Sequence, residues 1–267
     1  SEAAMTTITS ADNPRFRDLA KILQSGRERR KSGLALLEGV HLVAAYQQHC
    51  GLPEQVIINA DRGGEAEVAT LLAALAPLEP LIFSAALFAR LSSVDTPTGI
   101  MAVIKAPLRS TIPAQPGSCV ILEDIQDPGN LGSILRTTAA AGLREVYLSR
   151  ACADVWSPRV LRAGMGAHFL LDIYDGVDLG ALAGSFPGRI IATHLHGRQS
   201  LYDTELCGTI GLVFGNEGAG LSRPLLDAAK EIVTIPMPGG TESLNIAAAA
   251  AVCLFERVRQ GTIRTRE

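Results

Sequence analysis

Residues 119–138 have the sequence Cys119-Val-Ile-Leu-Glu-Asp-Ile-Gln-Asp-Pro-Gly-Asn130-Leu-Gly-Ser-Ile-Leu-Arg136-Thr-Thr. The first four residues are all apolar, a pattern typical of strands buried on both faces of a parallel sheet. The Asp-Pro-Gly step that follows is a turn sequence, and residues 130–141 are compatible with a helix. The stretch therefore predicts a strand, a polar loop and a helix, the unit from which α/β sheets are built.

The same alternation of apolar strands and helices continues toward the C-terminus. Strands are expected at residues 119–122, 145–148, 169–173, 189–193, 210–214 and 232–235, and helices at 130–141, 158–165, 179–183, 221–229 and 243–258. Ser243 is a favourable N-cap for the last helix. This half is predicted to be an α/β domain with a mostly parallel sheet, in which ligands bind beyond the carboxyl ends of the strands.

The first half of the chain has shorter elements. Strands are expected at residues 34–39, 55–59, 81–83 and 99–105, and helices at 40–49 and 65–76. Residues 107–117 contain three prolines and no periodicity, which indicates a linker. The predicted organisation is a smaller α/β domain at 1–106, a linker at 107–117 and the larger domain at 118–267.

Composition excludes several classes of protein. With 47% hydrophobic residues, the chain can bury a core and is not globally disordered. It contains neither an uninterrupted apolar run of roughly 18 residues, which a membrane span needs, nor a basic-then-apolar leader. The five cysteines form no Cys-x-x-Cys pair, and His194 and His196 have no evident third ligand. We therefore expect a soluble, cytoplasmic protein with no metal site and no contact with a membrane.

Three polar, glycine-rich loops, at residues 123–130, 213–222 and 235–245, follow predicted strands. Each loop alone is compatible with ordinary turn chemistry, but together they bring Arg136, Glu217 and Asn245 to one edge of the sheet. A dinucleotide site is disfavoured because Gly-x-Gly-x-x-Gly is missing and the glycines at 215, 218 and 220 have a different spacing. No Walker-type phosphate loop is present either.

The three loops resemble the motifs of the SpoU (TrmH-like) ribose 2′-O-methyltransferases of the SPOUT superfamily. The matching motifs are Asp-Pro-Gly-Asn-x-Gly-x-x-x-Arg, Gly-Asn-Glu-Gly-x-Gly and Ile-Pro-Met-x-Gly-x-x-x-Ser-Leu-Asn. Residues 34–43 are similar to the ribosomal-protein-like, substrate-binding domain of that family. The resemblance implies S-adenosylmethionine as methyl donor, a C-terminal trefoil knot and a homodimer. The implied acceptor is a ribose 2′-hydroxyl in structured RNA, above all 23S ribosomal RNA; the alternatives are tRNA or a non-catalytic RNA-binding module.

The resemblance also assigns roles to individual residues. It implies cofactor binding by Thr193, Gly215, Asn216, Gly218, Ile235, Met237, Leu244 and Asn245, and catalytic roles for Asn130, Arg136, Glu217, Ser243 and Asn245. Arg136 matches the arginine to which the family assigns the general-base role. A guanidinium normally stays protonated, so Arg136 has a second possible role as a clamp on the neighbouring phosphate. Ser243 is either a helix cap or a ligand of the substrate.

Basic residues concentrate near the N-terminus. The candidate RNA-binding side chains are Arg15, Arg17, Lys21, Arg27, Arg29, Arg30 and Lys31. A solvated helix face is the more usual explanation of such a run by itself, but a second basic stretch at 257–266 makes polyanion binding more plausible. Near Arg159 and Arg162 the chain departs from the family pattern Ala-Ser-x-Gly-Ala, because Gly164 replaces the serine.

Overall fold

The computed structural model describes residues 6–264, without the side chains of residues 263 and 264. The chain divides into two compact units. Unit 1 contains the residues up to Pro107 together with Trp156–Phe169, and unit 2 contains Leu108–Val155 and the residues from Leu170 onward. The boundary at Pro107 falls in the proline-containing segment that the sequence marks as a linker. Residues 156–169 pack with unit 1, although they lie between two strands of unit 2 in the sequence.

Unit 2 is built on one seven-stranded sheet. In spatial order its strands are β7 (Asp172–Tyr174), β6 (Glu145–Leu148), β5 (Cys119–Leu122), β10 (Ile210–Phe214), β8 (Arg189–Thr193), β11 (Glu231–Thr234) and β9 (Gln199–Ser200). Every pair of neighbours is parallel, which confirms the predicted parallel α/β sheet. The short apolar strands β5, β6, β8 and β10 have the predicted bounds.

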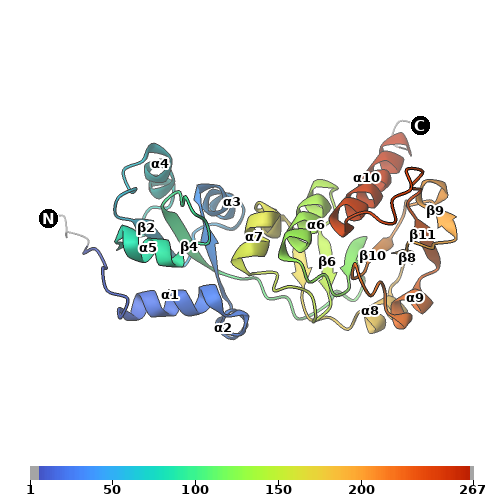
Figure 1. Ribbon diagram of the computed structural model, residues 1–267, viewed down its shortest axis with the longest axis horizontal. Coiled ribbons are helices and arrows are strands. Elements are labelled where there is room, and N and C mark those ends of the chain that lie inside the picture. Colours follow the sequence, from blue (N-terminus) through green and yellow to red (C-terminus); the bar gives the residue numbers. More distant parts are fainter. Residues whose placement is uncertain (1–5, 265–267) are drawn as a thin grey trace. The chain divides into compact units, whose positions relative to one another are not determined.

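Helices cover both faces of this sheet (Figure 1). On one face α6 (Pro128–Ala140) packs against α10 (Ile246–Arg264), and on the other α8 (Leu179–Ser185) packs against α9 (Arg223–Ala228). Alternate residues of each strand point to opposite faces, so a strand that is apolar throughout is buried on both sides. This explains why all five residues of β10 are buried.

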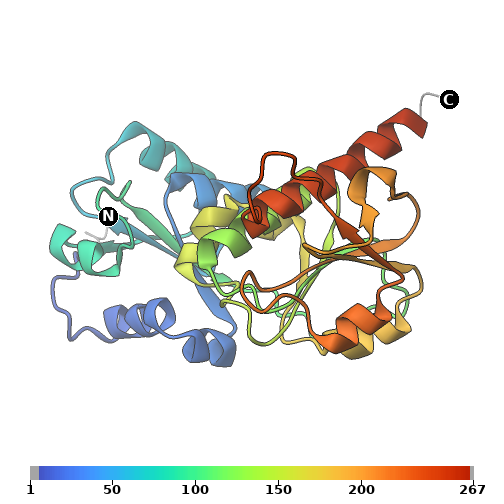
Figure 2. The same cartoon turned by 45° about the vertical axis from the view of Figure 1, so that its right-hand side comes forward.

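The strand order determines where the polar loops meet. Strand β10 lies between β5 and β8, and β11 lies on the far side of β8. Because all four strands are parallel, the loops that follow them leave from the same edge of the sheet. Figure 2 shows the turns before α10 and the loop after β10 at this edge.

Unit 1 has a four-stranded mixed sheet. In order its strands are β1 (Leu34–Glu38), β4 (Ile100–Lys105), β2 (Gln55–Asn59) and β3 (Leu81–Phe83); only the β2–β3 pair is parallel. Apolar residues of α1 (Pro14–Gln24) and α5 (Ala85–Leu91) pack on one face of the sheet. The helices α3 (Val40–Cys50) and α7 (Pro158–Gly164) contact β1, and α3 also contacts α4 (Ala66–Ala74). The short helix α2 (Gly26–Ser32) follows α1.

Several elements differ from those that the sequence predicts. Residues 167–170 form a 3-10 helix and the strand begins only at Asp172, because Met165 and Gly166 have positive φ angles and the Phe169 ring packs on Tyr46 at 5.3 Å within unit 1. Helix α5 was not expected from its short apolar sequence. The last helix begins at Ile246 rather than at residue 243, so the prediction that Ser243 is its N-cap is wrong.

Candidate cofactor and active site

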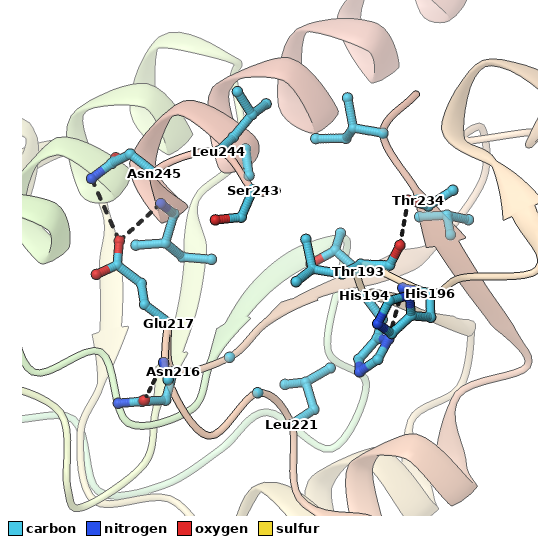
Figure 3. A pocket seen from close by; sticks show the side chains of 18 of the residues that line it. Thr193, His194, His196, Asn216, Glu217, Leu221, Thr234, Ser243, Leu244 and Asn245 are labelled. Carbon is cyan, nitrogen blue, oxygen red and sulfur yellow. Dashed lines mark hydrogen bonds between the residues drawn. The ribbon is translucent and has the colours of Figure 1, made fainter. Parts of the chain in front are cut away.

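A cavity of about 580 Å³ lies at the carboxyl ends of β8, β10 and β11 in unit 2 (Figure 3). All eight predicted cofactor residues line it: Thr193, Gly215, Asn216, Gly218, Ile235, Met237, Leu244 and Asn245. The predicted catalytic residues Glu217 and Ser243 line it as well. The second and third polar loops of the sequence therefore form two walls of one cavity.

The loop after β10 is held in shape by the side chain of Asn216. Its Oδ1 accepts hydrogen bonds from the backbone N–H groups of Gly218 (2.8 Å) and Ala219 (3.0 Å). Its Nδ2 donates to the carbonyl of Asp124, which follows β5 (2.9 Å). These three bonds use the polar atoms of the amide, so Asn216 shapes the cavity wall and joins it to the first polar loop.

Gly215 allows the loop to close on itself. A Cβ atom at this position would lie 2.6 Å from the carbonyl oxygen of Gly220 and 2.6 Å from a methyl carbon of Leu221. Because the nearest obstacle is backbone, a side chain at 215 requires the loop to shift. Gly220 itself has a φ of +71°, a conformation that favours glycine.

Glu217 connects three segments that are far apart in the sequence. Its Oε1 accepts hydrogen bonds from Asn130 Nδ2 (3.2 Å) and from the backbone N–H of Ile246 (3.1 Å), and Asn245 Nδ2 lies 3.5 Å away. Asn245 also donates to Asn130 Oδ1 over 3.0 Å. Within residues 6–264, no hydrogen bond to Glu217 Oε2 is found. The cluster thus leaves one carboxylate oxygen able to accept a hydrogen bond from a ligand.

Two side chains cap the helices that begin at this site. Asn245 Oδ1 accepts from the N–H groups of Ala247 (2.9 Å) and Ala248 (3.3 Å), which makes Asn245 the N-cap of α10. Asp127 caps α6 by accepting from Asn130 N (2.7 Å). Ser243 is exposed and points its hydroxyl toward the cavity in Figure 3, so a ligand role remains for it.

The opposite wall consists of β8 and the turn that follows it. Thr193 Oγ1 donates to the carbonyl of Val213 (3.1 Å), which fixes β8 to β10. His194 and His196 line the cavity, and the backbone N–H of His196 donates to His194 Nδ1 (3.1 Å). These histidines, Leu221 and Ile246 line the site although the sequence motifs do not indicate them. A usable signal existed for the histidines, because they directly follow a predicted strand.

Two predicted catalytic residues lie outside the cavity lining. Asn130 is half-buried and reaches the site through its bonds to Glu217 and Asn245. Arg136 is exposed on α6, two turns further along the helix, and forms no ion pair with any residue that the structure describes. The chain therefore builds the cofactor-side wall by itself and leaves the Arg136 guanidinium facing solvent.

The candidate RNA-binding residues fall into three groups. Arg15, Arg27, Arg30 and Lys31 are exposed, and none of them is in an ion pair with a described residue. Arg17 and Lys21 form exposed ion pairs with Asp12 (2.7 Å) and Asp18 (3.2 Å), which are weak interactions.

Arg29 is different, because its side chain is buried. Its Nη1 donates to the carbonyls of Ile22 (2.6 Å) and Leu23 (2.8 Å) near the C-terminal end of α1. The prediction that Arg29 contacts RNA is therefore corrected, since its charge satisfies carbonyl groups inside the fold.

In the C-terminal basic stretch, Arg259 pairs with the buried Glu256 (2.8 Å), and residue 266 lies outside the described residues.

Among residues 6–264, no helix is both long and apolar enough to cross a membrane. Nor does this part of the chain hold a cluster of three or more His, Cys, Asp and Glu side chains suited to a metal ion.

Two stretches of the chain match known protein families. Residues 117–255 match the SpoU rRNA Methylase family, and residues 13–102 match the MRM3-like substrate binding domain. An uncharacterized tRNA/rRNA methyltransferase of Synechocystis sp. is 34% identical, covering 96% of this chain and 94% of that protein. A 23S rRNA (guanosine(2553)-2′-O)-methyltransferase of Bacillus subtilis is 29% identical, covering 94% and 98% of the two chains. The crystal structure of the SpoU methyltransferase AviRb from Streptomyces viridochromogenes, in complex with AdoMet, superposes with a TM-score of 0.82 at 26% identity, covering 94% of this chain and all of that one.

Proposed function

Because the chain belongs to the SpoU rRNA methylase family, we propose that it transfers a methyl group from S-adenosylmethionine to a ribose 2′-hydroxyl of ribosomal RNA, most specifically 23S rRNA. The observation that carries the proposal is the cavity on which the loops after β8, β10 and β11 converge, with the Asn130–Glu217–Asn245 cluster at one side. The names of the similar proteins, among them a 23S rRNA 2′-O-methyltransferase and a structure with AdoMet bound, support it.

The cavity fits S-adenosylmethionine in size and chemistry. Its volume of about 580 Å³ lies within the range of roughly 300–1,000 Å³ that is usual for small-molecule sites. Leu221, Ile235 and Leu244 provide apolar surface for an aromatic base, and the glycine loop brings backbone polar groups close. When bound, the cofactor supplies an electrophilic methyl group on a positively charged sulfur.

The residues of the cluster position the acceptor. Glu217 Oε1 is held by the Ile246 N–H and the Asn130 amide, so the direction of Oε2 is fixed. In our proposal Oε2 accepts a hydrogen bond from the acceptor ribose and aligns its oxygen with the methyl carbon. Alignment of this kind can lower a barrier by several kcal/mol, up to about 7–11. We propose that Ser243, which also lines the cavity, contacts the same nucleotide.

Arg136 retains two proposed roles. As a general base, in its neutral guanidine form, it would accept the proton of the 2′-hydroxyl. As a clamp, in its protonated form, it would bind the adjacent phosphate through its fork of N–H donors. Its exposure and the absence of an ion pair with a described residue suit contact with a polyanion. Both roles predict that Arg136→Ala abolishes methylation while cofactor binding remains.

Unit 1 is proposed to bind the RNA substrate. The exposed cations Arg15, Arg27, Arg30 and Lys31 provide phosphate contacts, and Arg17 and Lys21 can exchange their weak ion pairs for phosphates. The match of residues 13–102 to a substrate binding domain supports this assignment.

Three further features are proposed from the family resemblance. The protein forms a homodimer, the loops after β10 and β11 belong to a trefoil knot, and the protein acts in the cytoplasm, where ribosomal RNA is found. The dimer contact is proposed to include α10, on which Phe255 is exposed. Sedimentation of the wild type and of Phe255→Glu checks the dimer, and a purely monomeric wild type contradicts it.

The function is tested with 23S rRNA from cells that lack the gene. Incubation of this RNA with the protein and methyl-labelled S-adenosylmethionine should label one nucleotide, and mapping should place the methyl group on its 2′-oxygen. Labelling of tRNA instead would show that the substrate is tRNA and not 23S rRNA. Retained turnover in Arg136→Ala would remove that residue from the chemistry, and no labelling of any cellular RNA would contradict the proposed function.

A further inference from the structure

A second cavity, of about 190 Å³, lies within unit 1 and shares no residue with the cofactor cavity. Leu36 on β1, Leu42 on α3 and Leu161 on α7 form its apolar floor. All three side chains are buried in the protein fold. The floor therefore combines the substrate-binding domain with a helix from the part of the sequence that matches the methylase family.

The loop at residues 92–98 forms one wall and is fixed from two sides. Glu38 Oε2 accepts hydrogen bonds from Ser93 N (2.9 Å) and Ser93 Oγ (2.6 Å), and Ser92 Oγ donates to Oε1. Arg162 Nη1 on α7 donates to the carbonyl of Ser93 (3.0 Å). The Glu38 carboxylate thus accepts hydrogen bonds from three donors. These bonds and the one from Arg162 hold the cavity wall in shape.

The rim of the cavity is polar and carries positive charge. Thr96 and Thr98 line it and are exposed; the Thr98 hydroxyl accepts from Val40 N (3.3 Å). Arg162 also lines it, and Arg159 is exposed on the same helix. Neither arginine is in an ion pair with a described residue. The apolar floor matches the face of a base, and the hydroxyl groups match the polar edges of that base. The guanidinium at the entrance matches the phosphate of the same nucleotide.

We propose that this cavity holds a single unpaired nucleotide of the RNA substrate, with its base on the leucine floor and its phosphate on Arg162. The inference rests on the proposed function, because it takes the substrate to be RNA. A regular A-form duplex is excluded as the occupant, since its bases are stacked and paired and cannot enter a cavity. The RNA region that the enzyme binds therefore contains a loop or a bulge.

The test fills the cavity entrance and leaves its surroundings unchanged. Thr96→Trp places a large side chain at the rim, and Asp95→Trp places the same side chain at the adjacent exposed position, which does not line the cavity. Binding of 23S rRNA from cells that lack the gene is measured directly for both variants and the wild type. We expect Thr96→Trp to weaken RNA binding about tenfold, because the base loses its apolar contact with the leucine floor, and Asp95→Trp to bind like the wild type.

A second variant tests the phosphate contact. Arg162→Gln retains an N–H donor for the Ser93 carbonyl but has no charge. Its RNA affinity should fall, and the slope of log K against log salt should decrease by about one. Calorimetry with S-adenosylmethionine should give the wild-type affinity for all variants, because the cofactor cavity shares no residue with this one.

The outcomes separate this inference from the proposed function. If the wild type methylates 23S rRNA and Thr96→Trp and Arg162→Gln both retain wild-type RNA affinity, the nucleotide cavity is wrong and the function stands. If the wild type methylates no RNA, the function fails, whereas the binding measurement still decides for or against the cavity. Equal loss of binding in Thr96→Trp and Asp95→Trp would also overturn the inference.

Discussion

Asn245 donates a hydrogen bond to Asn130 over 3.0 Å, although 115 residues separate them in the sequence. The two asparagines lie at the N-terminal turns of α10 and α6, the helices that pack against each other on one face of the sheet. Glu217 accepts from both helix starts and completes the cluster. The site therefore depends on helix packing as much as on the loops themselves.

The first prediction concerns Glu217. In Glu217→Gln the side chain keeps one acceptor oxygen, but the second oxygen is replaced by an NH₂ group that cannot accept from a ribose hydroxyl. We expect kcat for RNA methylation to fall roughly tenfold to a hundredfold, because the acceptor loses its alignment, with the affinity for S-adenosylmethionine changed much less. Single-turnover methylation and calorimetry measure the two quantities, and an unchanged kcat would contradict the positioning role.

The second prediction concerns the glycine loop. Gly215→Ala places a methyl group 2.6 Å from the Gly220 carbonyl, so the loop must shift and the cavity wall with it. Cofactor affinity should fall by about tenfold or more. Gly239→Ala is the matched control, because a Cβ there meets no atom within 4 Å. Calorimetry on both variants checks the expectation, and equal affinities would show that the Gly215 contact does not shape the site.

The third prediction contrasts two neighbouring arginines on α2. Arg30 is exposed, so Arg30→Gln should weaken RNA binding and lower the slope of log K against log salt by about one, without changing thermal stability. Arg29 donates to two carbonyls inside the fold, so Arg29→Gln should lower the Tm. Filter binding at several salt concentrations and thermal melts distinguish the two. The opposite pattern would show that the roles are reversed.

The fourth prediction concerns pH and Glu256. Hydrogen bonding to Arg259 holds the pKa of this carboxyl group below its ordinary value of 4.5. The folded state therefore binds a proton less readily than the unfolded state, so the stabilisation is present at neutral pH and is lost as pH falls through the folded pKa. Glu256→Gln should lower the Tm at pH 7 by roughly 2–4 °C, and this difference should shrink below pH 4.5.

Asp227→Asn provides the control for that experiment. Its carboxylate forms an exposed ion pair with Arg223 on α9 (3.0 Å), which contributes little to stability. Thermal melts between pH 3 and 8 should show no comparable difference for this variant. A Glu256→Gln difference that grows toward low pH would contradict the assigned direction of the pKa.

The central strands of the sheet, and part of the cavity lining, could be predicted from the sequence. Strands such as β10 are apolar at every position, and polar glycine loops follow them, so both the parallel sheet and the loops at its edge could be predicted. The family resemblance then selected the lining residues, from Thr193 to Asn245. These are local patterns, which a linear sequence records directly.

Only the tertiary structure decided how individual polar side chains are used. Arg29 and Arg30 are indistinguishable in the sequence, yet one is buried against backbone carbonyls and the other faces solvent. Asn245, and not Ser243, caps α10, because the cap depends on where the helix begins after packing on α6. Residues 156–169 pack in unit 1 although their neighbours in the sequence lie in unit 2. The physical reason is that hydrogen bonding and burial depend on contacts between residues distant in sequence, which periodicity does not encode.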